Sequence, residues 1–328
     1  MNKHNLPLVL MTHTLPGEWI ASLTGKCRLV TGPVDATFFA PDVLSHIEEA
    51  EGLFTLLTIP IKLDLLERAR KLRVISNMAA GVDNIDVAQC TQRGIPVGNT
   101  PGVLTEGTAD LAMALLLSIA RGLPRARQDA MTGEWKTWSP TGWLGADLFG
   151  ATLGIVGMGK IGKAVARRAL GFGMRIVYYD PAPCADTPGT FLPLEELFRH
   201  SDFISLHIPL SPQTFHLVNA QLLGLMKPSA YLINTSRGTV VDQPALVRAL
   251  TAEMLAGAAL DVTDPEPLPP DHPLFQLPNC LILPHIGSAT YQTRRRMAEL
   301  ACGNLLAGLA GRPLTYCVNP EVYLPRQE

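Results

Sequence analysis

Short apolar runs alternate with segments of helical spacing through the first hundred residues. Apolar runs lie at residues 8–11, 54–57 and 74–76, and amphipathic stretches lie at 43–47 and 63–69. A run of about four apolar residues predicts a buried strand, whereas apolar positions that recur about every 3.6 residues predict a helix. Strands that alternate with helices are typical of the α/β class and its parallel sheets.

From residue 151 the alternation continues through the larger part of the chain. Six apolar runs predict six strands, at residues 152–156, 175–179, 203–207, 230–234, 257–260 and 280–283. Helical segments separate these runs, so we predict a doubly wound parallel sheet.

The chain length and two long predicted helices indicate how the chain is divided into domains. At roughly 150 residues per domain, 328 residues favour two domains. A helix at 105–119 follows a Pro-Gly break, and a last helix at about 291–310 leads back toward the N-terminal part. We therefore predict an α/β fold of two Rossmann-like doubly wound domains, the first of them discontinuous. Their predicted bounds are residues 1–100 with 290–328, and residues 101–289.

The composition excludes several classes of protein. Hydrophobic residues make up 47% of the chain, and 27 Lys and Arg oppose 29 Asp and Glu, for a net charge of −2. This chain is too apolar for a disordered scaffold, and no basic run marks a nucleic-acid or anionic-membrane surface. The longest uncharged apolar run is about half of a membrane span, and the first residues lack a secretion signal. We expect a cytoplasmic protein with a small-molecule partner.

The six cysteines are widely spaced along the chain. They form no C-x-x-C pair and no Cys/His group at zinc-site spacing. We therefore expect reduced, structural thiols and no metal site.

The most specific motif is a glycine-rich turn after the first strand of the second domain. Gly157, Gly159 and Gly162 form the pattern G-x-G-x-x-G, which encloses Lys160 and Ile161. The glycines allow a tight turn, a close approach of the backbone to a pyrophosphate, and close packing of helix on strand. Free N–H groups at the start of the following helix would hold the phosphates of a dinucleotide.

Asp180 indicates which dinucleotide is bound. It ends the next predicted strand, 18 residues after Gly162, near the spacing of about 20 expected for an acidic residue that binds the adenosine ribose hydroxyls. A carboxylate there repels a 2′-phosphate, so we predict NAD, with NADH preferred to NADPH. The nearby Arg175, Arg167 and Lys160 leave NADP open, and an Asp before a proline also suits a solvated turn.

Three polar residues follow strand ends in the second domain: Arg237, Glu266 and His285. The carboxyl ends of strands in an open α/β sheet face the ligand crevice, so these side chains can converge. Reduction of a 2-keto acid needs a cation that holds the carboxylate and polarises the carbonyl, and a proton donor for its oxygen. Arg237 offers a planar fork, His285 offers the proton, and Glu266 would favour the imidazolium form. Taken singly, each also fits a surface charge, a rigid turn or a structural histidine.

A loop of small residues follows the predicted strand at 74–76. Gly81 and the alanines before it suit a loop that brings bare backbone N–H groups to a ligand. An anion could lie there.

Three of the four tryptophans lie together in a polar, turn-rich stretch: Trp135, Trp138 and Trp143. Such a cluster favours a subunit contact, so we expect a homodimer through residues 123–150, with Trp138 and Trp143 as candidates to reach the partner's site. A small satellite core under a loop is the alternative.

Together these motifs resemble the D-2-hydroxyacid dehydrogenase family over essentially the whole chain. The matching segments lie at residues 80–86, 99–102, 157–162, 234–238, 260–262, 265–267 and 284–288. The resemblance implies that Arg237, Glu266 and His285 are catalytic. It also implies that the discontinuous domain binds the substrate and the other domain binds the dinucleotide.

Further binding residues follow from the same resemblance. Ala80 and Gly81 would hold the substrate carboxylate through backbone N–H groups, and Ser288 is a further candidate for substrate contact. Asp261 would meet the nicotinamide amide. The remaining implied cofactor contacts are Thr108, Pro209, Thr214, Thr235 and Gly287.

Within the family, the chain looks most like the glyoxylate/hydroxypyruvate reductases. The segments that carry this likeness lie at residues 260–263, 266–269, 272–274 and 282–290. Members of this branch often prefer NADPH, so Asp180 is a departure. Phosphoglycerate- and phosphite-type members carry a cation near the small-residue loop, which residues 77–81 lack. Those types, and a non-enzymatic NADH-sensing corepressor that keeps the same three residues, are the alternatives.

Overall fold

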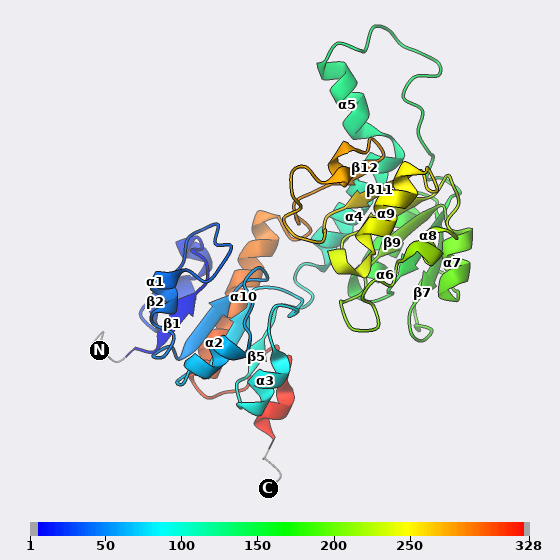
Figure 1. Ribbon diagram of the computed structural model, residues 1–328. Coiled ribbons are helices and arrows are strands. Elements are labelled where there is room, and N and C mark those ends of the chain that lie inside the picture. Colours follow the sequence, from blue (N-terminus) through cyan, green and yellow to red (C-terminus); the bar gives the residue numbers. More distant parts are fainter. Residues whose placement is uncertain (1–5, 325–328) are drawn as a thin grey trace. The chain divides into compact units, whose positions relative to one another are not determined.

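The computed structural model describes residues 6–324 and divides into two compact units. The described residues of Met1–Leu104 and Thr290–Glu328 form the first unit, and Thr105–Ala289 form the second (Figure 1). Each unit contains its own parallel sheet. The prediction of two doubly wound α/β units is therefore confirmed.

In the described part of the first unit, the sheet has five strands in the order β2-β1-β3-β4-β5. The strands are β1 (Leu8–Met11), β2 (Arg28–Thr31), β3 (Gly52–Thr55), β4 (Val74–Asn77) and β5 (Val97–Gly98). All the pairings are parallel, and this order is one of the two common doubly wound orders. The central strands β1, β3 and β4 are buried along their whole length, as their continuous apolar runs require.

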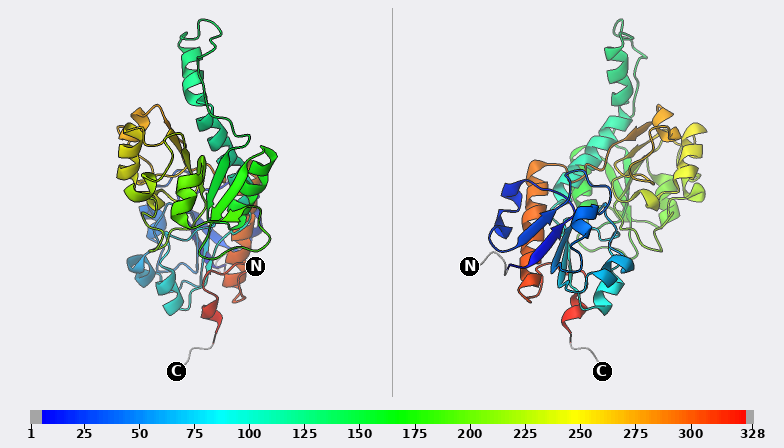
Figure 2. Two further views of the ribbon diagram at one scale, coloured as in Figure 1. Left: turned by 90° about the vertical axis from the view of Figure 1, so that its right-hand side faces the viewer. Right: turned by 60° about the vertical axis from the view of Figure 1, so that its left-hand side comes forward.

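Short helices and one long helix surround this sheet. They are η2 (Gly17–Trp19), η3 (Ala21–Leu23), α1 (Pro41–Leu44), α2 (Leu63–Arg68), α3 (Val87–Gln92), α10 (Tyr291–Leu309) and η6 (Pro320–Tyr323). The long helix α10 lies along the strands of its own unit in both views of Figure 2. Gly308 touches the Val74 side chain, and Leu305 and Leu309 lie against Gly52, so α10 packs on β3 and β4.

The second unit has a seven-stranded parallel sheet in the order β12-β11-β10-β9-β6-β7-β8. Its strands are β6 (Thr152–Val156), β7 (Arg175–Tyr179), β8 (Thr190–Phe191), β9 (Phe203–Leu206), β10 (Tyr231–Asn234), β11 (Gly257–Leu260) and β12 (Cys280–Ile282). Counted within the unit, the order reads 7-6-5-4-1-2-3. This is the dinucleotide-binding order 3-2-1-4-5-6 with one further strand.

Helices cover both faces of this sheet. The helices are α4 (Thr105–Ala120), α5 (Leu123–Met131), α6 (Lys160–Gly171), α7 (Leu194–His200), α8 (Ala220–Leu223) and α9 (Gln243–Thr251), with η4 (Gly238–Val240) and η5 (Pro273–Gln276). Residues of α4 and α6 share one hydrophobic core with β6, and residues of α7, α8 and α9 share the other with β9 and β10. Arg168 of α6 also binds Glu106 and Asp110 of α4, at 2.7 Å each.

Several strands differ from the sequence prediction. Strand β2 carries exposed ends because it lies at the edge of its sheet, and β5 and β8 have only two residues each, so none of the three produces an apolar run. The strand predicted at 54–57 lies instead at Gly52–Thr55, since the chain leaves the sheet before the exposed Leu57.

Helix α5 and the loop after it project from the rest of their own unit (Figures 1 and 2). No side chain of α5 is buried. Among residues 6–324, no helix is long and apolar enough to cross a membrane.

The packing of α10 on β4 makes a testable prediction. A Cβ at Gly308 would lie 2.5 Å from the Val74 side chain. Gly308→Ala should therefore lower the free energy of unfolding by about 1–3 kcal/mol, the usual cost of overpacking a core. Gly303→Ala is the matched control, since a Cβ there meets nothing within 4 Å and alanine favours a helix. Urea unfolding measures both variants, and equal stability would contradict the packing.

Candidate active site

The glycine-rich turn after β6 leaves an open cradle at the start of α6. Gly157 has φ +95°, and a Cβ there would lie 2.7 Å from the His207 carbonyl oxygen. A Cβ at Gly162 would lie 2.1 Å from the Gly157 carbonyl oxygen. In contrast, a Cβ at Gly159 would meet none of the described residues within 4 Å, and Gly159 precedes Lys160, the first residue of α6, with no side-chain cap. The chain's own packing explains two glycines, and the open space at the third fits a ligand phosphate.

Asp180 follows β7 and lies against this turn. Its Oδ2 accepts a hydrogen bond from the Met158 backbone N at 2.8 Å. The carboxylate therefore stands beside the glycine cradle, where the adenosine ribose of a dinucleotide is expected. Lys160 and Ile161 occupy the first turn of α6, as the motif requires.

A buried carboxylate fixes the segment that follows β12. Asp261 is 1% exposed, and its two carboxylate oxygens accept hydrogen bonds from the backbone N of Ile286 at 2.7 Å and of Gly287 at 2.8 Å. Burial raises the pKa of Asp261 above its ordinary value, although these two N–H groups oppose the shift. Thr108 Oγ1 donates to the Gly287 carbonyl oxygen at 3.2 Å. Asp261 thus positions the chain directly after His285, a role that the sequence analysis did not assign to it.

The three predicted catalytic residues follow three neighbouring strands. Arg237 comes after β10, Glu266 after β11 and His285 after β12, and these strands are adjacent in the sheet. His285 Nδ1 lies 2.5 Å from Glu266 Oε1, and the two side chains are 23% and 36% exposed. His285 also has φ 52°, a strained conformation for a residue with a side chain. The hydrogen bond to Glu266 uses Nδ1, so Nε2 is the ring nitrogen left for a substrate.

The loops that carry Arg237 and Glu266 touch each other. A Cβ at Gly238 would lie 1.9 Å from the Thr263 carbonyl oxygen, so only glycine allows this approach. Asn234 shapes the arginine turn, since its Nδ2 donates to the Arg237 carbonyl oxygen at 2.9 Å.

Gln243 holds the glutamate loop from the start of α9. It donates from Nε2 to the Asp264 carbonyl oxygen and accepts at Oε1 from the Asp264 backbone N. Sequence reasoning missed Asn234 and Gln243 as supports of the site. Neither residue gives a signal in the sequence, because composition and spacing do not distinguish a buried amide from a surface amide.

The other predicted cofactor residues lie on nearby loops of the second unit. Thr235 Oγ1 shares a hydrogen bond with His207 Nδ1 at 3.4 Å, and burial lowers the pKa of His207 to about 4, so that this imidazole is neutral near pH 7. Thr214 Oγ1 donates to the Pro209 carbonyl oxygen at 2.7 Å and so closes its loop. Ser288 follows Gly287 and is partly exposed.

Ala80 and Gly81 belong to the first unit, in the loop after β4. Their carbonyl oxygens accept hydrogen bonds from Asn99 Nδ2 at 2.8 Å and from Asn77 Nδ2 at 2.9 Å. Both residues are partly exposed.

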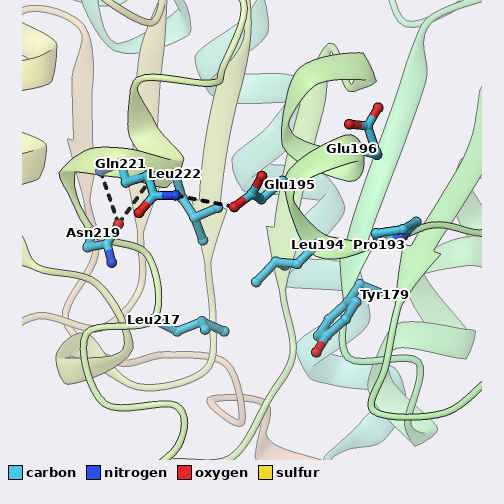
Figure 3. Close-up of a pocket in the computed structure, with 9 residues that line it drawn as sticks. All are labelled: Tyr179, Pro193, Leu194, Glu195, Glu196, Leu217, Asn219, Gln221 and Leu222. Carbon is cyan, nitrogen blue, oxygen red and sulfur yellow. Dashed lines mark hydrogen bonds between the residues drawn. The ribbon is translucent and has the colours of Figure 1, made fainter.

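A separate depression of about 640 Å³ lies between α7 and α8 (Figure 3). Tyr179, Leu194 and Leu217 line its apolar side, and Gln221 Nε2 donates to Glu195 Oε1 across it at 3.2 Å. None of the predicted site residues lines this depression. Within residues 6–324, no group of three His, Cys, Asp or Glu side chains could hold a metal ion.

The fold and the site together define a class of protein. A seven-stranded parallel sheet carries a glycine cradle, a carboxylate at the end of its second strand, and an Arg-Glu-His set on neighbouring strand ends. These are the parts of a dinucleotide-dependent oxidoreductase.

Comparisons with known proteins identify the family within this class. The model of the D-isomer specific 2-hydroxyacid dehydrogenase NAD-binding domain matches residues 113–287. A glyoxylate reductase of Korarchaeum cryptofilum is 46% identical over 321 residues, which are 96% of this chain and 97% of that protein. The chain belongs to the D-isomer specific 2-hydroxyacid dehydrogenase family, and it is an NAD(P)-dependent oxidoreductase of small 2-hydroxy and 2-keto acids.

Solved structures agree with this assignment. A protein from Thermus thermophilus is 49% identical, with a TM-score of 0.90 over 95% of this chain and 99% of that chain. An NADPH-dependent glyoxylate/hydroxypyruvate reductase from Sinorhizobium meliloti, solved with NADP and malonate, is 32% identical, with a TM-score of 0.85 over 98% and 99% of the two chains. The resemblance to the glyoxylate reductase branch is therefore confirmed.

Proposed function

We propose that the chain reduces glyoxylate and hydroxypyruvate to glycolate and D-glycerate, with NADH as the preferred cofactor. The observation that carries this proposal is the His285–Glu266 hydrogen bond, on strand ends that neighbour the one carrying Arg237. Curated relatives and solved structures with this likeness bear the names glyoxylate reductase and glyoxylate/hydroxypyruvate reductase.

The roles of the three side chains follow from their chemistry. When bound, the reduced nicotinamide supplies the hydride to the keto carbon. Arg237 holds the carboxylate and polarises the carbonyl with its planar guanidinium, and His285 donates the proton from Nε2 to the carbonyl oxygen. Glu266 accepts the hydrogen bond of Nδ1, which keeps the ring oriented with Nε2 available to the substrate.

The small-residue loop favours a small, singly charged substrate. We propose that Ala80 and Gly81 bind the carboxylate through backbone N–H groups, and that Ser288 contacts the substrate. Residues 77–81 contain no cation for a second anionic group. This argues against a phosphorylated substrate.

Removal of His285 tests the reaction. His285→Asn should lower kcat for glyoxylate by about 10²- to 10⁴-fold, the usual contribution of a general acid. His200→Asn is the matched control, because His200 pairs with Glu196 at 3.2 Å on the exposed surface of α7 and should leave kcat unchanged. NADH oxidation measures both variants. Tight NADH binding without turnover of any small 2-keto acid by the wild type would contradict the proposed function.

Asp180 tests the cofactor preference. We propose that its carboxylate binds the adenosine ribose and repels a 2′-phosphate, so Asp180→Ser should shift the NADH/NADPH ratio of kcat/KM toward NADPH by about tenfold or more. Asp271→Ser removes an exposed charge elsewhere in the same unit and should keep the ratio. An unchanged ratio in Asp180→Ser would refute the assignment. The other proposed cofactor contacts are Thr108, Gly157, Gly159, Lys160, Ile161, Gly162, Pro209, Thr214, Thr235, Asp261 and Gly287.

We also propose a homodimer through residues 123–150. Trp135, Trp138, Leu144 and Phe149 are all more than half exposed in this stretch, which is unusual for so many large apolar side chains. A second copy of the same segment would cover them in a two-fold contact.

Light scattering tests the dimer. The wild type should have twice the chain mass of 35.4 kDa, and the double variant Trp138→Ser, Leu144→Ser should shift toward the monomer. Phe38→Ser, which removes an exposed ring from the first unit, should not. A monomeric wild type would end this proposal.

A reducing compartment such as the cytoplasm suits the thiols of this chain. All six cysteines are free, and burial raises the pKa of Cys90 and of Cys280 to about 12, which keeps them as unreactive thiols.

A further inference from the structure

Three consecutive carbonyl groups of the loop at residues 79–81 are each held by a hydrogen bond within the first unit. The first accepts from the backbone N of Thr100 at 2.8 Å, the second from Asn99 Nδ2 at 2.8 Å, and the third from Asn77 Nδ2 at 2.9 Å. The donors come from the ends of β4 and β5, so they support the loop from the body of its own sheet.

The hydrogen bonds to these carbonyl oxygens determine where the N–H groups of the same peptides point. A trans peptide is planar, and its N–H points opposite to its C=O. The N–H groups of Ala80, Gly81 and Val82 therefore point away from the three donors. Among the residues that the structure describes, none accepts a hydrogen bond from these N–H groups, and all three residues are partly exposed. The loop thus offers three adjacent donors to an anion.

The amide orientation of Asn77 is fixed by a second asparagine. Asn84 Nδ2 donates to the carbonyl oxygens of Leu56 and Ile59 at 3.0 Å each, so its Oδ1 is left to accept from Asn77 Nδ2 at 3.3 Å. A flipped Asn77 would place its own oxygen against Asn84 Oδ1 and the Gly81 carbonyl oxygen. In the observed orientation Asn77 Oδ1 is buried and has no hydrogen-bond partner among the described residues. The hydrogen bonds of Asn84 therefore set the orientation in which Asn77 Nδ2 holds the Gly81 carbonyl oxygen.

Asn99 is supported from helix α10. Asn304 Nδ2 donates to the Asn99 carbonyl oxygen at 3.0 Å, while Asn304 Oδ1 accepts from the Tyr316 backbone N at 3.2 Å. A Cβ at Gly98 would lie 2.9 Å from Asn304 Cβ and Nδ2, so a glycine there leaves room for the Asn304 side chain. The backbone of Asn99 is therefore fixed by Asn304. The side chain of Asn99 forms the hydrogen bond to the Ala80 carbonyl oxygen.

We propose that Asn99 and Asn77 are positioning residues that set the substrate's anion subsite. They turn the loop carbonyls inward, so that a neutral array of N–H groups faces the carboxylate before it binds. This rests on the proposed function only in taking a 2-keto acid carboxylate as the anion. Because both residues belong to the first unit, their loss should weaken carboxylate binding and leave NADH binding to the second unit intact.

Steady-state kinetics and NADH binding test this proposal. Asn99→Ala and Asn77→Ser should each raise KM for glyoxylate by about tenfold or more, change kcat by less than about threefold, and leave the Kd of NADH at the wild-type value. Asn319→Ala is the matched control. Asn319 is a buried asparagine of the same unit, and the hydrogen bonds of its side chain go to Val97, Ile95, Thr91 and Cys317, outside the loop. It should lower Tm and keep KM.

A second measurement separates this proposal from the proposed function. Oxalate, a small carboxylate probe, should raise the Tm of the wild type with NADH present, and this rise should be smaller in Asn99→Ala and Asn77→Ser. The wild type could turn over no 2-keto acid while oxalate still stabilises it and does not stabilise the two variants. This result would contradict the proposed reductase function and support the positioning role of Asn99 and Asn77.

Two results would overturn the inference. One is a wild-type KM and a wild-type oxalate response in both variants. The other is an equal rise of KM in Asn319→Ala, which would show that general loosening of the unit accounts for the effect. A wild type that neither turns over a keto acid nor responds to oxalate overturns both proposals. Should Asn99→Ala not fold, Asn99→Ser and Asn77→Ser give the same comparison.

Discussion

The buried Asp261 joins the ends of the three strands that the predicted catalytic residues follow. Its backbone N donates to the Asn234 carbonyl oxygen at the end of β10, its carbonyl oxygen accepts from the His285 backbone N, and its carboxylate accepts from the two residues that follow. Hydrogen bonds to a charged acceptor contribute about 1.5–3 kcal/mol each, roughly twice the value of neutral ones. The backbone and side chain of this one residue after β11 therefore determine where the histidine segment lies relative to the arginine turn. The strained φ of His285 persists because these bonds overdetermine its backbone.

Close approach of backbones supplies the other constraint. Gly238 allows the arginine turn to touch the glutamate loop, and Gly162 allows α6 to begin directly against the turn at Gly157. In both places a methyl group would lie about 2 Å from a carbonyl oxygen. Gly159 differs, because no described residue lies within 4 Å of the place where its Cβ would be. The same residue type thus serves internal packing at two positions and leaves room for a ligand at the third.

Much of this arrangement could be predicted from the sequence. Long buried strands such as β6 and β7 produce continuous apolar runs, and the glycine turn between strand and helix identifies the dinucleotide cradle. The edge strand β2 and the two-residue strands could not be found in this way, since edge positions are polar and short strands have no period. The His285–Glu266 contact joins residues 19 apart, and only the parallel order of β11 and β12 brings them together. The supporting roles of Gln243 and Asn234 could not be predicted, because a buried amide has no periodic or charge signature.

The two units offer different kinds of polar group to a ligand. The second unit supplies ionisable side chains. Such a side chain needs a charged or hydrogen-bonded neighbour when a ligand excludes water from it, and Glu266 is this neighbour for His285. The first unit supplies no cation in residues 77–81 and instead turns peptide dipoles outward by holding their carbonyl ends. Peptide dipoles carry no net charge, so they attract a single carboxylate without requiring a second anionic group for balance. The substrate that we propose has one carboxylate and one carbonyl, and these two kinds of group suit it: N–H donors for the carboxylate and an ionisable pair for the carbonyl.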